Sequence, residues 1–179
     1  MKRTAILGIG SPFGDDRAGW LVIETLEAAV DPRMLTEAGI TIAALDRPGA
    51  ALLEHMRGFD RAVLIDAVRG DASPGTVLTL DAGTLGPGAR LSSHGVGVAE
   101  ALALGAELGM LPAELSLFGI AVNEQDRALD EDLDGPVSES VRKGVLRVAT
   151  EIAIALGLPA AASNRVRAPR SAQSVSRAG

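Results

Sequence analysis

An apolar segment near the N-terminus, residues 4–9, passes into a turn with glycines at Gly8, Gly10 and Gly14 and reaches two adjacent acids, Asp15 and Asp16. A short apolar run bounded by glycines predicts a buried strand. Apolar residues at helical spacing then continue to about residue 30, with one of the two acids expected as the helix N-cap or in its first turn. A strand that turns directly into a helix predicts an α/β fold.

The same alternation continues along the chain. Strands separated by helices imply parallel pairing, and the Pro74-Gly75 turn makes the strand after it an antiparallel edge. Three-layer α/β/α architecture is therefore expected for one domain, residues 1–159, with a mixed, mostly parallel sheet. The further predicted strands are 40–45, 61–65, 76–80 and 115–122, and the further predicted helices are 50–56, 96–108 and 137–156.

Composition narrows the function classes. The chain has 179 residues, of which 47% are hydrophobic and 2% aromatic, so its core is built from Ala, Val, Leu and Ile. It has no cysteine, which excludes disulfides, thiolate nucleophiles and zinc–thiolate sites. No apolar run is long enough to span a membrane, and the first apolar run is too short for a secretory signal. A cytoplasmic protein is expected.

Charge is unevenly distributed. The net charge is -6, yet residues 160–179 contain four arginines and no acid. The acidic body argues against a nucleic-acid surface. Residues 160–179 are rich in Ala, Ser and Arg, and we expect this basic tail to be disordered because it cannot bury enough apolar surface.

Gly8-Ile9-Gly10 suggests a dinucleotide-binding turn, but the rest of that fingerprint is missing. Phe13 stands where the third glycine belongs, and Asp46, the acid at the end of the second predicted strand, is too far along the chain. Acids at the start of the following helix would also repel a pyrophosphate. These glycines are better explained by positive φ in the turn and by close approach of two backbone segments.

Three side chains follow predicted strands or precede a helix. Asp16 follows the first strand, Asp66 follows the strand at 61–65, and His94 precedes the helix at 96–108. Ligands of open α/β sheets bind beyond the carboxyl ends of the strands. Two carboxylates and one imidazole suit a divalent ion such as Ni²⁺ or Zn²⁺ with positions left open.

Each of these residues also has a structural explanation when it is taken alone. Asp15 and Asp16 favour a helix N-terminus, Asp66 can cap a turn, and a histidine before a helix is usually structural. Ser92 and Ser93 beside His94 raise Ser-His-Asp chemistry, but neither lies on a nucleophile elbow.

The motifs taken together resemble the hydrogenase maturation protease family, over roughly residues 4–156. They occur in this order: Gly8-Ile9-Gly10-Ser11-Pro12-Phe13-Gly14-Asp15-Asp16, Leu64-Ile65-Asp66-Ala67-Val68, Pro74-Gly75-Thr76, Ser93-His94-Gly95 and Leu117-Phe118-Gly119-Ile120. The resemblance implies a mixed five-stranded sheet between helices. It also implies an endopeptidase that removes a short C-terminal peptide from the large-subunit precursor of a nickel-iron hydrogenase once nickel is inserted.

The resemblance assigns metal binding and catalysis to Asp16, Asp66 and His94, with the nickel supplied by the substrate. The partner is the hydrogenase large-subunit precursor, and we expect a monomer that binds neither nucleic acid nor membrane. The chain departs from the family at Ser11 and Arg17, and its loop before the acids is one residue shorter, which leaves Asp15 as an alternative to Asp16. Two other functions stay open: a non-catalytic checkpoint for the nickel-loaded subunit, and a peptidase with another protein substrate.

Overall fold

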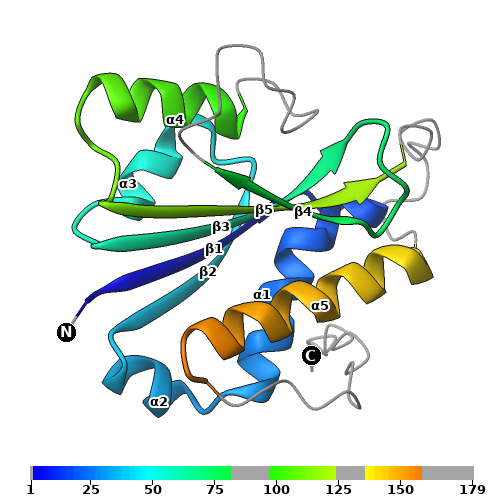
Figure 1. The fold of residues 1–179 in the computed structure, drawn as a ribbon, viewed down its shortest axis with the longest axis horizontal. Helices are drawn as coiled ribbons and strands as arrows, with labels where there is room; N and C mark the ends of the chain where they lie inside the picture. Colours follow the sequence, from blue (N-terminus) through cyan, green and yellow to red (C-terminus); the bar gives the residue numbers. More distant parts are fainter. Residues whose placement is uncertain (1, 82–96, 124–135, 159–179) are drawn as a thin grey trace, which may run out of the picture.

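Five strands form one mixed sheet in the order β2-β1-β3-β5-β4 (Figure 1). The computed structural model of the chain describes residues 2–81, 97–123 and 136–158. Neighbours among β1, β2, β3 and β5 pair in parallel, and β4 pairs antiparallel with β5 at one edge, as the sequence predicted. The strand bounds are β1 Thr4–Gly10, β2 Ile40–Asp46, β3 Arg61–Arg69, β4 Val77–Asp81 and β5 Glu114–Val122.

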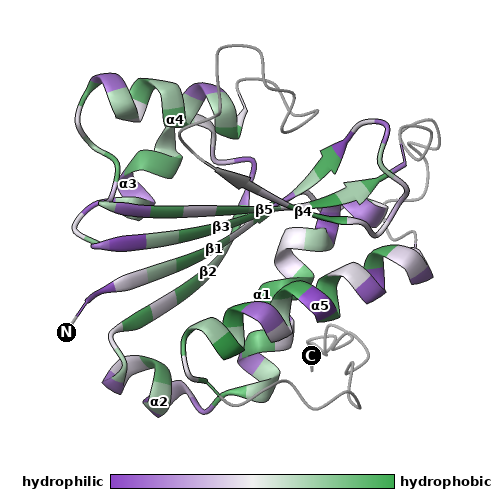
Figure 2. Cartoon of the chain, viewed as in Figure 1, coloured by the Kyte–Doolittle hydropathy of each residue, from purple (hydrophilic) through white to green (hydrophobic). Residues whose placement is uncertain are grey.

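Helices cover both faces of the sheet, which confirms the three-layer α/β/α architecture (Figure 1). One apolar cluster joins α1, α2 and α5 to one face, and a second joins α3 and α4 to the other. In Figure 2 the strands are largely hydrophobic, whereas α5 carries both hydrophobic and hydrophilic residues. The helices are η1 Gly14–Arg17, α1 Ala18–Ala29, α2 Pro32–Glu37, η2 Gly49–Ala51, α3 Leu52–Met56, α4 Val98–Glu107 and α5 Glu139–Ala155.

Two glycines let α1 lie directly on β1. A Cβ atom added to Gly8 would overlap the carbonyl oxygen of Gly19, and one added to Gly19 would overlap the carbonyl oxygen of Ile9. The expected close approach of two backbone segments is therefore confirmed. The expected positive φ is found at Gly14, with φ 44°, and not at Gly8 or Gly10.

The structure corrects two element predictions. β3 continues through Asp66 to Arg69, paired with β5 as far as Val122, so Asp66 lies inside a strand and not after it. The helix α2 was not predicted, although Asp31 caps it by accepting from the backbone N–H of Arg33. The prediction that Ser92 or Ser93 caps the next helix falls outside the described residues, and the N-cap of α4 is Gly97.

No helix in the described ranges is long and apolar enough to cross a bilayer. The predicted boundary after residue 159 and the predicted disorder of residues 160–179 concern a part of the chain outside the described residues. Both therefore stay predictions.

Candidate active site

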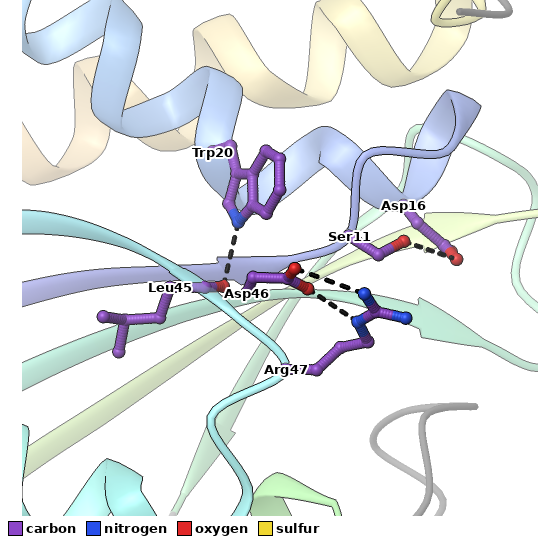
Figure 3. Close-up of polar contacts among 6 residues, drawn as sticks. All are labelled: Ser11, Asp16, Trp20, Leu45, Asp46 and Arg47. Atoms are coloured by element: carbon purple, nitrogen blue, oxygen red, sulfur yellow. Dashed lines mark hydrogen bonds and ion pairs between the residues drawn. The ribbon is translucent and has the colours of Figure 1, made fainter. Parts of the chain in front are cut away.

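Asp16 and Asp66 are buried together at the edge of the sheet where β1 ends. Asp16 comes from η1 and is 8% exposed, and Asp66 comes from β3 and is 2% exposed. Ser11, which directly follows β1, donates two hydrogen bonds to Asp16. Its backbone N–H donates to the Asp16 carbonyl at 3.3 Å, and its Oγ donates to Asp16 Oδ2 at 3.4 Å (Figure 3).

The carboxylate of Asp66 is buried and only partly hydrogen-bonded. The backbone N–H of Ala67 donates to it, but within the described residues no hydrogen bond reaches its buried Oδ2 atom. Burial, and after it the negative charge of Asp16, holds the pKa of Asp66 well above the ordinary carboxyl value. A buried carboxylate oxygen without a donor is costly, and binding a cation is one way to satisfy it.

The side chain of Asp66 belongs to one covered face of the sheet. Strand alternation puts its side chain on the same face as Leu64 and Val68, which is the face covered by α4. Its register partner on β5 is Gly119, so no side chain stands next to the carboxylate on that strand. The space next to Gly119 is filled by Val68, whose Cγ1 atom would lie 2.8 Å from a Cβ atom added to the glycine.

Arg69 completes a buried group of three charges. Its NH2 group donates to Asp16 Oδ1 at 2.9 Å, and the side chains of Arg69 and Asp16 are 14% and 10% exposed. The positive charge of Arg69 also acts on Asp66, whose pKa it lowers against the larger effect of burial. Two carboxylates and one guanidinium leave a net negative charge when all three are ionised, which suits a cationic ligand.

The structure separates the two adjacent acids. Asp15 turns away from Asp66 and accepts two hydrogen bonds from Ser138, from its backbone N–H at 2.6 Å and from its Oγ at 2.8 Å. Neither acid caps α1, whose N-cap is Arg17 with no side-chain hydrogen bond. Asp15 thus links η1 to the start of α5, and Asp16 is the acid that lies beside Asp66.

The turn after β2 lies near this edge. Arg47, which has a φ of 41°, pairs with Asp46 through an Nε–Oδ1 contact of 2.6 Å, and both side chains are about half exposed (Figure 3). Its guanidinium also lies 6.0 Å from the ring centre of Phe13. Trp20 fastens this strand end from α1 by donating from Nε1 to the Leu45 carbonyl at 2.9 Å.

His94, the third predicted site residue, lies outside the described residues. The residues that the structure describes contain no group of three or more His, Cys, Asp or Glu side chains suited to hold a metal. Of the predicted set of Asp16, Asp66 and His94, the structure therefore describes only the two carboxylates.

Sequence reasoning missed Arg69 and Ser138. Ser138-Glu139 before an apolar helical run is a cap signal, and Ser138 does cap α5 by accepting from Val141 N–H. Its contact with Asp15 spans 123 positions and has no local signal. Nothing local distinguishes Arg69 from an ordinary surface arginine at a strand end.

Comparisons with known proteins agree with one another. The family model of hydrogenase maturation proteases matches residues 22–154. The chain is 33% identical over 164 residues to the hydrogenase expression/formation protein HoxM of Azotobacter vinelandii, covering 88% of this chain and 75% of that protein. It is 29% identical over 157 residues to HupD of Rhizobium leguminosarum bv. viciae, covering 85% of this chain and 72% of that protein.

Solved structures give the same result. The hydrogenase maturating endopeptidase HybD of E. coli matches with a TM-score of 0.69 and 22% identity, covering 87% of this chain and 92% of that one, which shows the shared fold. The [NiFe] hydrogenase maturation protease HybD of Thermococcus kodakarensis matches with a TM-score of 0.57 and 29% identity, covering 86% of this chain and 98% of that one.

Proposed function

Because this chain belongs to the hydrogenase maturation protease family, we propose that it removes a C-terminal peptide from the large-subunit precursor of a nickel-iron hydrogenase after nickel has been inserted. Membership of the family makes it an endopeptidase. The observation that carries the proposal is the burial of two carboxyl groups, Asp16 and Asp66; burial, and after it the charge of Asp16, raises the pKa of Asp66. Such a pair favours a cationic feature in the substrate.

The nickel enters this proposal as part of the substrate. Asp16, Asp66 and His94 are the residues that would bind it, two through carboxylate oxygens and one through an imidazole nitrogen. The unsatisfied Oδ2 of Asp66 supports this assignment, because a bound cation would compensate its buried charge. Recognition of the ion would make cleavage depend on whether the precursor is loaded.

Other residues of the chain position the proposed metal-binding side chains. Ser11 and Arg69 hold the carboxylate of Asp16, while β3 fixes Asp66. His94 precedes Gly97, the N-cap of α4, by three positions, and α4 covers the sheet face that carries Asp66. An ion held there would anchor the substrate and polarise either the scissile carbonyl or a water molecule.

The test is the mass of a large-subunit precursor before and after incubation with the protein. We expect the nickel-loaded precursor to lose a C-terminal peptide and the nickel-free precursor to stay intact. Failure to cleave the loaded precursor at equimolar enzyme would contradict the proposal. A stable complex with the loaded precursor and no lost peptide would instead favour a non-catalytic checkpoint.

A matched pair of histidine variants tests the site. His94→Ala should abolish cleavage while the thermal unfolding midpoint stays close to that of the wild type. The control is His55→Ala, because His55 is the other histidine of the chain and is exposed on α3. Normal cleavage by His94→Ala would remove His94 from the site.

Cytoplasmic location and a monomeric state belong to the same proposal. Size-exclusion chromatography with light scattering is expected to give the mass of one chain, 18.3 kDa. A dimeric mass would contradict this part of the proposal alone.

A further inference from the structure

Arg69 is a charged partner of Asp16 that the family pattern did not lead us to expect. It is the last residue of β3, three positions beyond Asp66. Strand alternation sends its side chain to the α1 face of the sheet, the face of Ile65 and Ala67. Because η1 leads into α1, the guanidinium meets Asp16 there, at 2.9 Å from Oδ1.

The pairing is buried enough to matter energetically. The two side chains are 14% and 10% exposed, so solvent screens their attraction far less than it screens the half-exposed pair of Arg47 and Asp46. Arg69 therefore does what a bound cation would do for Asp16. It holds the carboxylate in place through the 2.9 Å contact with Oδ1.

The positive charge of Arg69 opposes the binding of a free metal ion to the carboxylates. A divalent ion bound by Asp16 would share that carboxylate with the guanidinium, and like charges that share one partner repel in a buried site. The repulsion lowers the affinity of the empty protein for a free ion. An ion that arrives within a large protein substrate brings additional binding energy that can overcome this repulsion.

We propose that Arg69 is a positioning residue that acts as an internal substitute for the metal: it holds Asp16 ready and prevents the empty protein from taking up free divalent ions. The inference rests on the proposed function, since it assumes that Asp16 and Asp66 meet the ion of the substrate. It adds that the chain discriminates against free metal through a charge of its own.

Isothermal titration of the isolated full-length protein with nickel chloride at neutral pH tests this. Arg69→Gln should bind Ni²⁺ at least about tenfold more tightly than the wild type, because it removes the positive charge that is paired with Asp16. Arg69→Lys retains the charge and should keep the weak affinity of the wild type. Arg57→Gln is the control, since it removes an exposed arginine that pairs with Glu54 on α3, and it should change the affinity little.

Arg69→Met is a second neutral variant, for use if Arg69→Gln does not fold, because methionine preserves the long apolar stem of a side chain that is mostly buried. Unchanged Ni²⁺ affinity in a folded neutral variant would overturn the inference, as would equal tightening by Arg69→Lys. A purely structural arginine would reduce stability without raising metal affinity. Failure of the proposed function is distinguishable, since it appears as an uncleaved loaded precursor with the wild type.

Discussion

Asp15 and Ser138 are joined by two hydrogen bonds across 123 positions, one from the backbone N–H of Ser138 and one from its hydroxyl group. The contact fastens η1 to the N-terminus of α5. Because Asp15 is engaged in this way, its neighbour Asp16 is the acid that faces Asp66. Two adjacent acids thus have different partners, and their substitutions should have different effects.

Asp15→Ala is expected to lower the free energy of unfolding by about 2 kcal/mol, since it removes a charged acceptor from two partly buried donors. Urea unfolding measures this loss. Asp16→Asn, the neighbouring control, should abolish cleavage of the loaded precursor while Asp15→Ala still cleaves at temperatures where it is folded. Loss of cleavage by a fully folded Asp15→Ala, with normal cleavage by Asp16→Asn, would reverse the two roles.

Asp66→Asn should make the protein more stable at pH 7, by on the order of 1 kcal/mol or more, while abolishing cleavage. The folded-state pKa of Asp66 is raised by burial above its unfolded value, so folding favours the protonated form. Its unfavourable contribution is absent at low pH and grows as pH rises from the unfolded pKa towards the folded one.

Unfolding in urea at pH 7 and near pH 4 checks both parts of this prediction. The stability difference between Asp66→Asn and the wild type should be larger at pH 7 than near pH 4. A variant that is less stable than the wild type at pH 7 would show that the charge of Asp66 is well satisfied in the fold.

Asp16 and Arg69 should show strong energetic coupling. In a double-mutant cycle with Asp16→Asn and Arg69→Gln, each single variant removes the 2.9 Å ion pair from the remaining charged side chain, so the double variant should lose less stability than the two singles together. The same cycle at Asp46 and Arg47, whose side chains are 50% and 46% exposed, should give a coupling below about 1 kcal/mol. Equal coupling at the two pairs would contradict the difference in burial.

Gly19→Ala should destabilise the protein although alanine favours helices. The added methyl group would meet the carbonyl oxygen of Ile9 and would lie 2.7 Å from that of Ile65, so α1 would have to move off the sheet. We expect a loss of more than about 2 kcal/mol in urea unfolding. Gly70→Ala is the control, because nothing lies within 4 Å of its added atom. A neutral Gly19→Ala would mean that α1 adjusts freely.

The sequence was sufficient for the fold because its signals are local. Apolar runs bounded by glycine gave β1 and β3, and the Pro74-Gly75 turn correctly predicted the antiparallel edge strand β4. The extension of β3 through Asp66 was missed because an acid after an apolar run usually indicates that the strand has ended. In the structure, pairing with β5 outweighs that local signal.

The proximity of the two acids was predicted from the sequence, but their hydrogen-bond and ion-pair partners were not. The proximity of Asp16 and Asp66 was anticipated from strands ending at one edge. In the structure only β1 ends there: its pairing with β3 stops at Ile65, and β3 continues through Asp66 to Arg69. The pairing of Asp16 with Arg69 and of Asp15 with Ser138 joins residues 53 and 123 positions apart. Tertiary contacts of this kind leave no periodic pattern in one sequence, and only the folded structure brings them out.

The most direct measurement is the intact mass of a large-subunit precursor, prepared with and without nickel and incubated with the wild type and with Asp66→Asn. We predict that only the nickel-loaded precursor with the wild type loses its C-terminal peptide. Cleavage of the nickel-free precursor, or undiminished cleavage by Asp66→Asn, would contradict a site in which buried carboxylates recognise the ion of the substrate.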